Sequence, residues 1–134
     1  MPARYAKLLL VAGLALLVSL VAFGNLTDYG SNFAFVHHVL AMDTIFPDAT
    51  IRYRAITAPW LQHAAYALII ATQLATAALL WAGAWRMWAR RRAPMALFRR
   101  AKGLATAGLS LGVLLWLVGF MAIGGEWFGM WQSQ

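Results

Sequence analysis

Three histidines are the residues of this sequence best suited to chemistry. His37 and His38 are adjacent, and His63 lies where a long apolar stretch begins. Imidazoles on two different elements could bind haem b as axial ligands, and together with Met42 they could bind copper. A simpler use is hydrogen bonding to the carbonyls or carboxylates of a loop. We therefore predict no metal site and no cofactor, and keep cofactor binding by His37, His38 and His63 as an alternative.

The carboxylates give little support to catalysis. Only four are present, and pairing with nearby Arg52 or Arg54 is the simplest use of Asp43 and Asp48. The sequence has no HExxH, no GxSxG and no glycine-rich phosphate loop, and without cysteine it has no thiolate chemistry. We predict no catalytic residue and no enzymatic activity.

Glu126 stands out among the acids because it follows two glycines and precedes Trp127. This pattern predicts a contact at the edge of a membrane, with Arg52 or Arg54 as the partner of Glu126. We expect interaction or structural roles, rather than catalysis, for a set of charged and aromatic residues on one side of the chain: Asp28, Asp43, Arg52, Arg54, Glu126 and Trp127.

The elements that must position these residues are apolar. Hydrophobic residues make up 63% of the 134 residues and charged residues only 11%, whereas soluble domains carry about 25% charged residues. Three stretches, at about 5–23, 61–85 and 104–124, are long enough to cross a bilayer, which requires about 20 apolar residues. Backbone groups in lipid must be bonded within the segment, so each span is helical. We predict a single all-α integral membrane domain over 1–134.

Charge orients the predicted spans. Nine of the eleven basic residues lie in the N-terminal tail or in the loop 86–103, and all four acids lie on the other side. The positive-inside rule then places the N-terminus and this loop in the cytoplasm of a bacterium and the loop 24–60 in the periplasm. The first segment also resembles a cleavable secretory signal, and we expect it to be retained. Since the basic residues flank apolar segments, we predict no nucleic-acid partner.

Small residues are expected to mediate helix packing, because lipid provides no hydrophobic drive for association. The third span contains the pair Gly108 and Gly112, and the first contains Ala15 and Ser19. In the second span three alanines recur at spacings of four: Ala67, Ala71 and Ala75. These faces pack either within the chain or against another subunit. Gln73, near the middle of the second span, should face protein rather than lipid.

The loop 24–60 is too long for a simple connection and should have structure of its own. Ser31 or Asn32 could cap a short helix that runs to about Met42. Its apolar residues fall on adjoining faces, which is typical of an amphipathic helix at the membrane surface. A turn is predicted at 46–48, and Pro59 should begin the second span.

Five segments together carry a resemblance to a known family. They are NLTDYGSN at 25–32, FVHHVLAMDT at 35–44, RAIT at 54–57, RAKGL at 100–104 and GGEWFGMWQS at 124–133. The chain resembles, over nearly its whole length, the bacterial family of predicted small integral membrane proteins called domain of unknown function 2165. The resemblance brings no activity with it. It implies four spans, so we expect a four-helix bundle whose last helix is missing from the chain that stops at Gln134.

The leading functional hypothesis is a non-catalytic accessory or scaffolding subunit of a larger inner-membrane complex, respiratory or photosynthetic. Its expected partners are membrane lipids and other membrane protein subunits. One alternative is a redox subunit that binds haem or metal through the histidines of the loop 24–60 and His63. Another is a small transporter or channel component, which the absence of charge within the spans disfavours.

Overall fold

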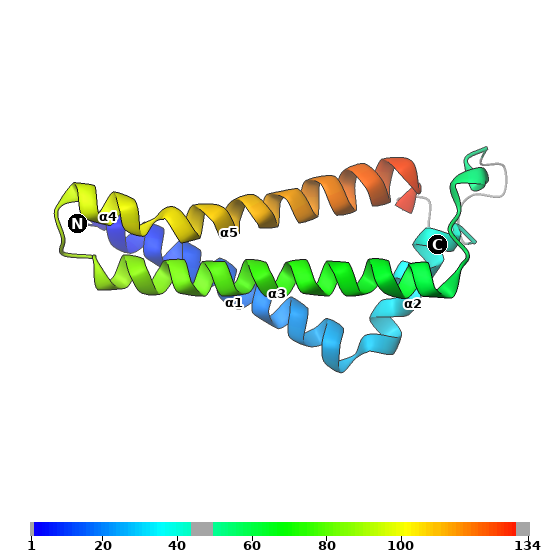
Figure 1. The fold of residues 1–134 in the computed structure, drawn as a ribbon, viewed down its shortest axis with the longest axis horizontal. Coiled ribbons are helices and arrows are strands. Elements are labelled where there is room, and N and C mark those ends of the chain that lie inside the picture. Colours follow the sequence, from blue (N-terminus) through cyan, green and yellow to red (C-terminus); the bar gives the residue numbers. More distant parts are fainter. Residues whose placement is uncertain (1, 44–49, 131–134) are drawn as a thin grey trace. The chain divides into compact units, whose positions relative to one another are not determined.

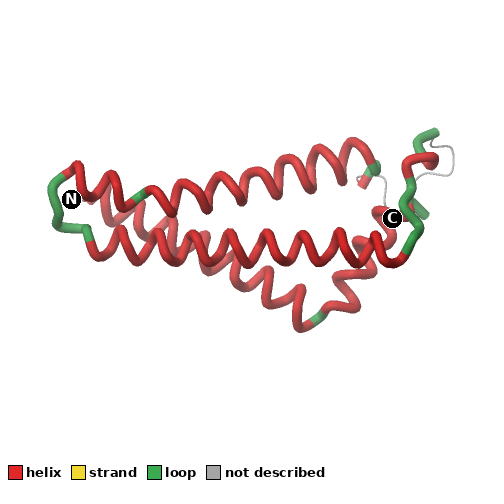
Figure 2. Tube along the Cα trace, viewed as in Figure 1, coloured by secondary structure: helices red, strands yellow, loops and turns green. Residues whose placement is uncertain are grey.

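A computed structural model describes residues 2–43 and 50–130 of the chain (Figure 1). Within these ranges all regular structure is helical, as Figure 2 shows. Three stretches are long and apolar enough to cross a membrane: Pro2–Thr27, Pro59–Ala89 and Met95–Trp127. The all-helical fold with three candidate spans, and with a short helix between the first two, is therefore confirmed.

The first span and the short helix almost form one helix. Helix α1 covers Pro2–Thr27, four residues beyond the expected end, and helix α2 follows at Tyr29–Ala41. Only Asp28 interrupts them, and its amide still donates to the carbonyl of Gly24 at 2.9 Å. The prediction that Ser31 or Asn32 caps α2 is wrong. Because the amide of Asn32 reaches the Asp28 carbonyl, few donors are left for a capping side chain to satisfy.

The chain then passes through one short helix to the second span. Helix η1 covers Arg52–Arg54, and helix α3 covers Pro59–Ala89 with proline at its first position, as predicted. The expected turn at 46–48 lies outside the described residues.

The last span is built from three consecutive helices. Helix α4 covers Met95–Ala101, α5 covers Gly103–Val113, and η2 continues from Leu114 to Trp127 with π-helical hydrogen bonding. The wider turn is visible at its end, where the Phe128 amide bonds to the Ile123 carbonyl five residues back, at 3.0 Å.

The chain divides into two compact units. One holds residues up to Phe23 together with 72–112, and it is called the basic unit here because most lysines and arginines belong to it. The other holds residues from Gly24 to Ala71 together with those from Val113 onward, and it is called the histidine unit because it contains all three histidines.

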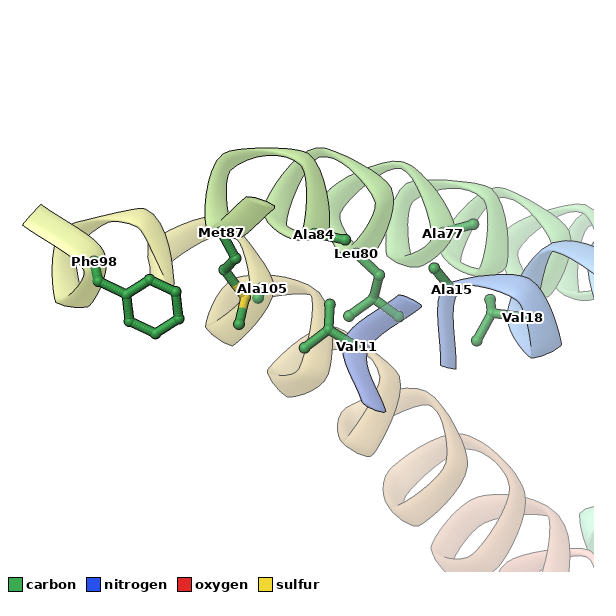
Figure 3. Packing of buried hydrophobic residues seen from close by; sticks show 9 residues of the cluster. All are labelled: Val11, Ala15, Val18, Ala77, Leu80, Ala84, Met87, Phe98 and Ala105. Carbon is green, nitrogen blue, oxygen red and sulfur yellow. The ribbon is translucent and has the colours of Figure 1, made fainter. Parts of the chain in front are cut away.

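Apolar side chains form the core of the basic unit (Figure 3). They come from α1, α3, α4 and α5 and are Val11, Ala15, Val18, Ala77, Leu80, Ala84, Met87, Phe98 and Ala105. Gly83 allows α3 to approach α5 closely, because a Cβ atom there would lie 2.5 Å from the backbone nitrogen of Ala105. Gly108 gives room to a side chain of α3, because a Cβ atom there would lie 3.0 Å from side-chain atoms of Leu80. Close backbone contact is thus the basis of this packing.

The alanine face predicted for the second span is not the face that packs within the chain. Ala67, Ala71 and Ala75 are all exposed, while the buried side of α3 in the basic unit presents Leu80, Gly83 and other residues of the core. The intramolecular alternative for these alanines is therefore wrong. The physical reason is that α3 has small residues on two sides, and the side with Gly83 matches the backbone of α5.

Candidate functional site

In the histidine unit, the backbone of Ile56 links the end of α2 to the beginning of α3. Ile56 lies in the segment that precedes α3. The amide of Ile56 donates to the carbonyl of Leu40 at 2.7 Å, which attaches this segment to the last turn of α2. The carbonyl of Ile56 accepts a hydrogen bond from Nε2 of Gln62 at 2.8 Å. Both backbone polar groups of Ile56 are thus used to hold the end of α2 near the beginning of α3.

Gln62 then fixes the orientation of His37. Its side chain is only 1% exposed, and its Oε1 lies 2.7 Å from Nδ1 of His37. A carbonyl can only accept, so the contact with Ile56 requires the amide NH2 on that side and leaves Oε1 facing the imidazole. Nδ1 of His37 must therefore donate, and the lone pair of the neutral ring resides on Nε2. That Nε2 lies 4.0 Å from Oδ2 of Asp43.

The backbone at Met42 brings Asp43 back towards the helix it follows. Met42 ends α2 in the left-handed conformation, with φ 54° and ψ 33°, which is uncommon for a residue other than glycine. Its side chain is fully buried and packs with Val39 and Phe128, so apolar contacts stabilise this conformation. The reversal places Oδ1 of Asp43 at 2.7 Å from Nδ1 of His38.

His37, His38 and Asp43 consequently form one cluster. One ligand atom from each lies within 4.8 Å of the other two, and the two imidazole rings meet edge to face with centroids 5.1 Å apart. The side chains are partly open to the outside, at 41% for His37 and 45% for both His38 and Asp43. Two imidazoles and a carboxylate are a donor set that divalent transition metals accept.

His63 takes no part in this cluster within the described ranges. Its ring stacks on Phe33 with centroids 3.9 Å apart, and its Nδ1 lies 2.7 Å from the hydroxyl of Tyr29. Tyr66 closes the aromatic group by an edge contact with Tyr29 and donates to the carbonyl of Asn25 at 3.0 Å. Adjacent residues on a helix point about 100° apart, so Gln62 faces His37 and His63 faces the aromatic rings.

Each of the two arginines of η1 donates a hydrogen bond to a backbone carbonyl. Arg54 donates to the carbonyl of Trp127 at 3.1 Å, and its guanidinium lies 4.3 Å from the centre of the Trp127 ring. Arg52 donates to the carbonyl of Met42 at 3.2 Å. The expected ion pair of Arg54 with Glu126 is not formed, because the guanidinium is directed to the next residue, and the Glu126 side chain is exposed.

The remaining residues singled out from the sequence are not members of the cluster. Asp28 is exposed at the junction of α1 and α2, where its side chain makes no capping hydrogen bond. Gln73 is 2% exposed, so its amide faces protein. Gly108 belongs to the packing of α3 against α5, and Gly112 is half-buried.

An apolar cavity of about 200 Å³ lies beside the cluster in the histidine unit. It is lined from α2 by Phe35, Val36, Val39 and Leu40, and from α3 and η2 by residues such as Leu68, Ile69, Leu115 and Phe120. The apolar side of α2 is the side that lines this cavity. The same helix thus presents its apolar residues to the cavity and its two histidines to Asp43.

Gln62 is the residue of this site that the sequence did not reveal. The available signal was a second polar residue beside His63 in the first turns of an otherwise apolar span. A buried amide at such a position needs hydrogen-bond partners on both of its ends, and here these are His37 and Ile56.

Comparison with known proteins agrees with the assignment as an integral membrane protein. No curated protein and no solved structure matches the chain. The profile of one family, described as predicted small integral membrane protein, matches residues 3–134. Because this match covers almost the entire sequence, the chain belongs to the predicted small integral membrane protein family DUF2165.

Proposed function

We propose that this protein is a non-catalytic accessory subunit of a larger complex in the bacterial inner membrane, with respiratory and photosynthetic complexes as the leading candidates. The observation that carries the proposal is an exposed small-residue face on α3, called the alanine face here. Its members follow helical spacing along the span and are Ala67, Ala71, Ala75, Ala78 and Ala82.

The alanine face suits a helix of another membrane protein. Small residues allow two backbones to approach closely, and this contact drives association where the hydrophobic effect cannot. All five alanines are exposed among the described residues, whereas the opposite side of α3 already packs within the chain. In the most apolar 18-residue stretch of α3, only 39% is buried. The corresponding stretches of the other two spans are buried to a smaller extent. Much span surface is therefore available to a partner and to lipid.

The proposed topology has the N-terminus and the arginine-rich loop in the cytoplasm and the segment 24–60 in the periplasm. It rests on the partition of charge under the positive-inside rule. A contact within the basic unit supports it, because the guanidinium of Arg4 donates to the carbonyls of Arg91 and Ala93. The basic N-terminal tail and the basic loop thus lie at the same end of that unit, as a shared compartment requires.

Enlarging the alanine face tests the partner proposal. Ala71→Leu and Ala75→Leu should prevent close approach and shift the protein, extracted in mild detergent, from a high-mass band on native gels to the mass of the free chain. Ala122→Leu is the matched control, because Ala122 is exposed among large apolar side chains such as Val118 and Met121. An unchanged high-mass band on native gels in Ala71→Leu and Ala75→Leu would contradict the proposal.

A second copy of the same chain is the main competing occupant of this face. Because the sequence contains no cysteine, Ala75→Cys provides a single crosslinking position without background. Oxidation should leave this variant monomeric or join it to a different polypeptide. A disulfide-linked homodimer in high yield would show self-association instead and would overturn the accessory role.

The same cysteine-free background tests the topology. Thr57→Cys places one thiol in the segment before α3, and Ala96→Cys places one in the first turn of α4, which follows the arginine-rich stretch; both positions are exposed. A membrane-impermeant maleimide added to intact spheroplasts should label Thr57→Cys and spare Ala96→Cys until the membrane is opened. The reverse pattern would contradict the orientation.

A further inference from the structure

We propose that His37, His38 and Asp43 bind one zinc ion. The proposal does not depend on the accessory role, since it concerns the histidine unit alone. It changes the expectation from the sequence, in which these histidines only bonded to the loop and Asp43 paired with an arginine.

The distances in the cluster match a zinc site. Zinc bonds of about 2.0–2.1 Å at tetrahedral angles place neighbouring ligand atoms about 3.3 Å apart. Oδ1 of Asp43 lies 2.7 Å from Nδ1 of His38, and the other carboxylate oxygen, Oδ2, lies 4.0 Å from Nε2 of His37. These two values bracket the required one, so rotations of side chains that are nearly half exposed can bring all three atoms to a common ion.

The protonation of His37 is already suited to this role. Gln62 accepts the Nδ1 proton and thereby leaves Nε2, the atom that faces Asp43, with its lone pair free. Metal-bound histidines commonly donate their other ring nitrogen to such a partner, which orients the ring and raises its basicity. Gln62 is itself held by the carbonyl of Ile56 and is almost fully buried, so the orientation exists before metal arrives.

His38 and Asp43 supply the other two ligands. Without metal, Nδ1 of His38 donates to the carboxylate; with zinc bound, Nδ1 coordinates and the ring proton transfers to Nε2 through water. The site then has two nitrogen ligands and one oxygen ligand, with water as the fourth. The thioether of Met42 is buried in apolar contacts and is not a ligand, which argues against the soft donor set that copper(I) prefers.

Zinc titration of the full chain tests the proposal. The protein is purified in detergent with a tag that lacks histidine, stripped with a chelator, and titrated with zinc chloride against a fluorescent zinc indicator. We expect one zinc per chain, and a loss of affinity of at least about 10-fold for His37→Ala, His38→Ala and Asp43→Asn, the last of which keeps the shape of an exposed side chain. His63→Ala is the matched control and should bind zinc like the parent.

Gln62 is tested as a positioning residue. Gln62→Leu should lower zinc affinity about 10- to 100-fold without removing a ligand. Imidazole nitrogen NMR should also show that His37 no longer holds its proton on Nδ1 alone, a change that general loosening of the fold would not restrict to this ring.

Three results would overturn the proposal. They are a stoichiometry well below one, unchanged affinity in both His38→Ala and Asp43→Asn, or an equal loss of affinity in His63→Ala. In each case the cluster is an ordinary hydrogen bond between histidine and aspartate.

Discussion

The helices of the basic unit and those of the histidine unit are held together by different kinds of contact. In the basic unit the helices meet through small and apolar residues, and Gly83 lets the backbone of α3 lie directly against that of α5. In the histidine unit, hydrogen bonds and stacked rings add to a small apolar cluster around Met42, and Gln62 links α2, the segment before α3, and α3 itself.

The same helix, α3, takes part in both arrangements. In the histidine unit its buried positions include Gln62 and Tyr66. In the basic unit they include Gln73 and Thr76, whose hydroxyl donates to the Thr72 carbonyl of the same helix, and then Leu80, Gly83 and Ala84. The hydrogen-bonding groups of the histidine unit serve segments that are not continuous helix, and such backbone needs polar partners when it is buried. A span that only packs against other spans needs shape more than polarity. The contrast therefore follows from what each part of α3 must hold.

The largest effect is expected from filling the closest approach in the basic unit. In Gly83→Ala the added Cβ would lie 2.5 Å and 2.7 Å from backbone atoms of Ala105, which cannot rotate away. We expect α3 and α5 to be forced apart at a cost of about 2–3 kcal/mol in the free energy of unfolding, as for other overpacked cores. Denaturation by SDS in mixed micelles measures this change.

Gly13→Ala is the matched control for that substitution. Gly13 lies in α1 of the same unit, and a Cβ atom there would meet nothing within 4 Å. Replacing an open helical glycine should stabilise the chain by up to about 1 kcal/mol. Equal effects of the two substitutions would show that close packing does not hold the basic unit together.

A smaller loss, confined to the histidine unit, is expected from Gln62→Leu. Leucine nearly preserves the volume but leaves the carbonyl of Ile56 without its donor, and a buried unsatisfied group costs about 1–3 kcal/mol. His37 is half-buried and can bond to water instead, so we expect about 2 kcal/mol in total. Hydrogen exchange of the Ile56 amide, which is bonded to Leu40, should accelerate accordingly.

Thr57→Val controls for the hydrogen-exchange measurement. Thr57 is exposed in the same segment, next to Ile56, and its substitution should leave exchange of the Ile56 amide unchanged. If Gln62→Leu and Thr57→Val behaved alike, the segment would be held by its apolar contacts rather than by the amide of Gln62.

Sequence alone predicted the helical class and the three spans because length and hydropathy determine them. It did not predict which side of α3 packs, since both sides carry small residues and only the fit of Gly83 to Ala105 distinguishes them. The end of α1 was also missed. The peptide at Asp28 keeps its hydrogen bond to Gly24, so no break in the pattern marks the junction.

The candidate site was predicted only in part. Both His37 and His38 were identified from residue type, and so was Asp43, but their assembly depends on the left-handed backbone of Met42. Methionine gives no sequence signal for that conformation, in contrast to glycine. Gln62 rather than His63 contacts His37 because of the rotation of α3 about its axis. A rotation of about 100°, equal to one residue, would direct His63 to His37 instead.

The smallest effect is expected from one polar contact between two spans of the basic unit. Nε1 of Trp81 donates to the hydroxyl of Ser19 at 2.8 Å, and that hydroxyl donates in turn to the carbonyl of Ala15. Trp81→Phe removes the donor and leaves no buried group unsatisfied, because Trp81 is 45% exposed and Ser19 keeps its bond to Ala15. We expect a coupling of about 0.6 kcal/mol, the average for hydrogen bonds between membrane helices.

A double-mutant cycle of Trp81→Phe with Ser19→Ala measures that coupling in the same SDS titration. The cycle separates the hydrogen bond from the loss of ring area, because that loss occurs in Trp81→Phe both with and without Ser19→Ala and therefore cancels. A coupling of about 2 kcal/mol or more would be as large as the loss expected for Gln62→Leu. Both units would then depend on side-chain hydrogen bonds, and the distinction between them would be lost. A value near the average leaves shape as the main determinant where spans pack only against spans, and polarity as the determinant where a span must also hold irregular backbone.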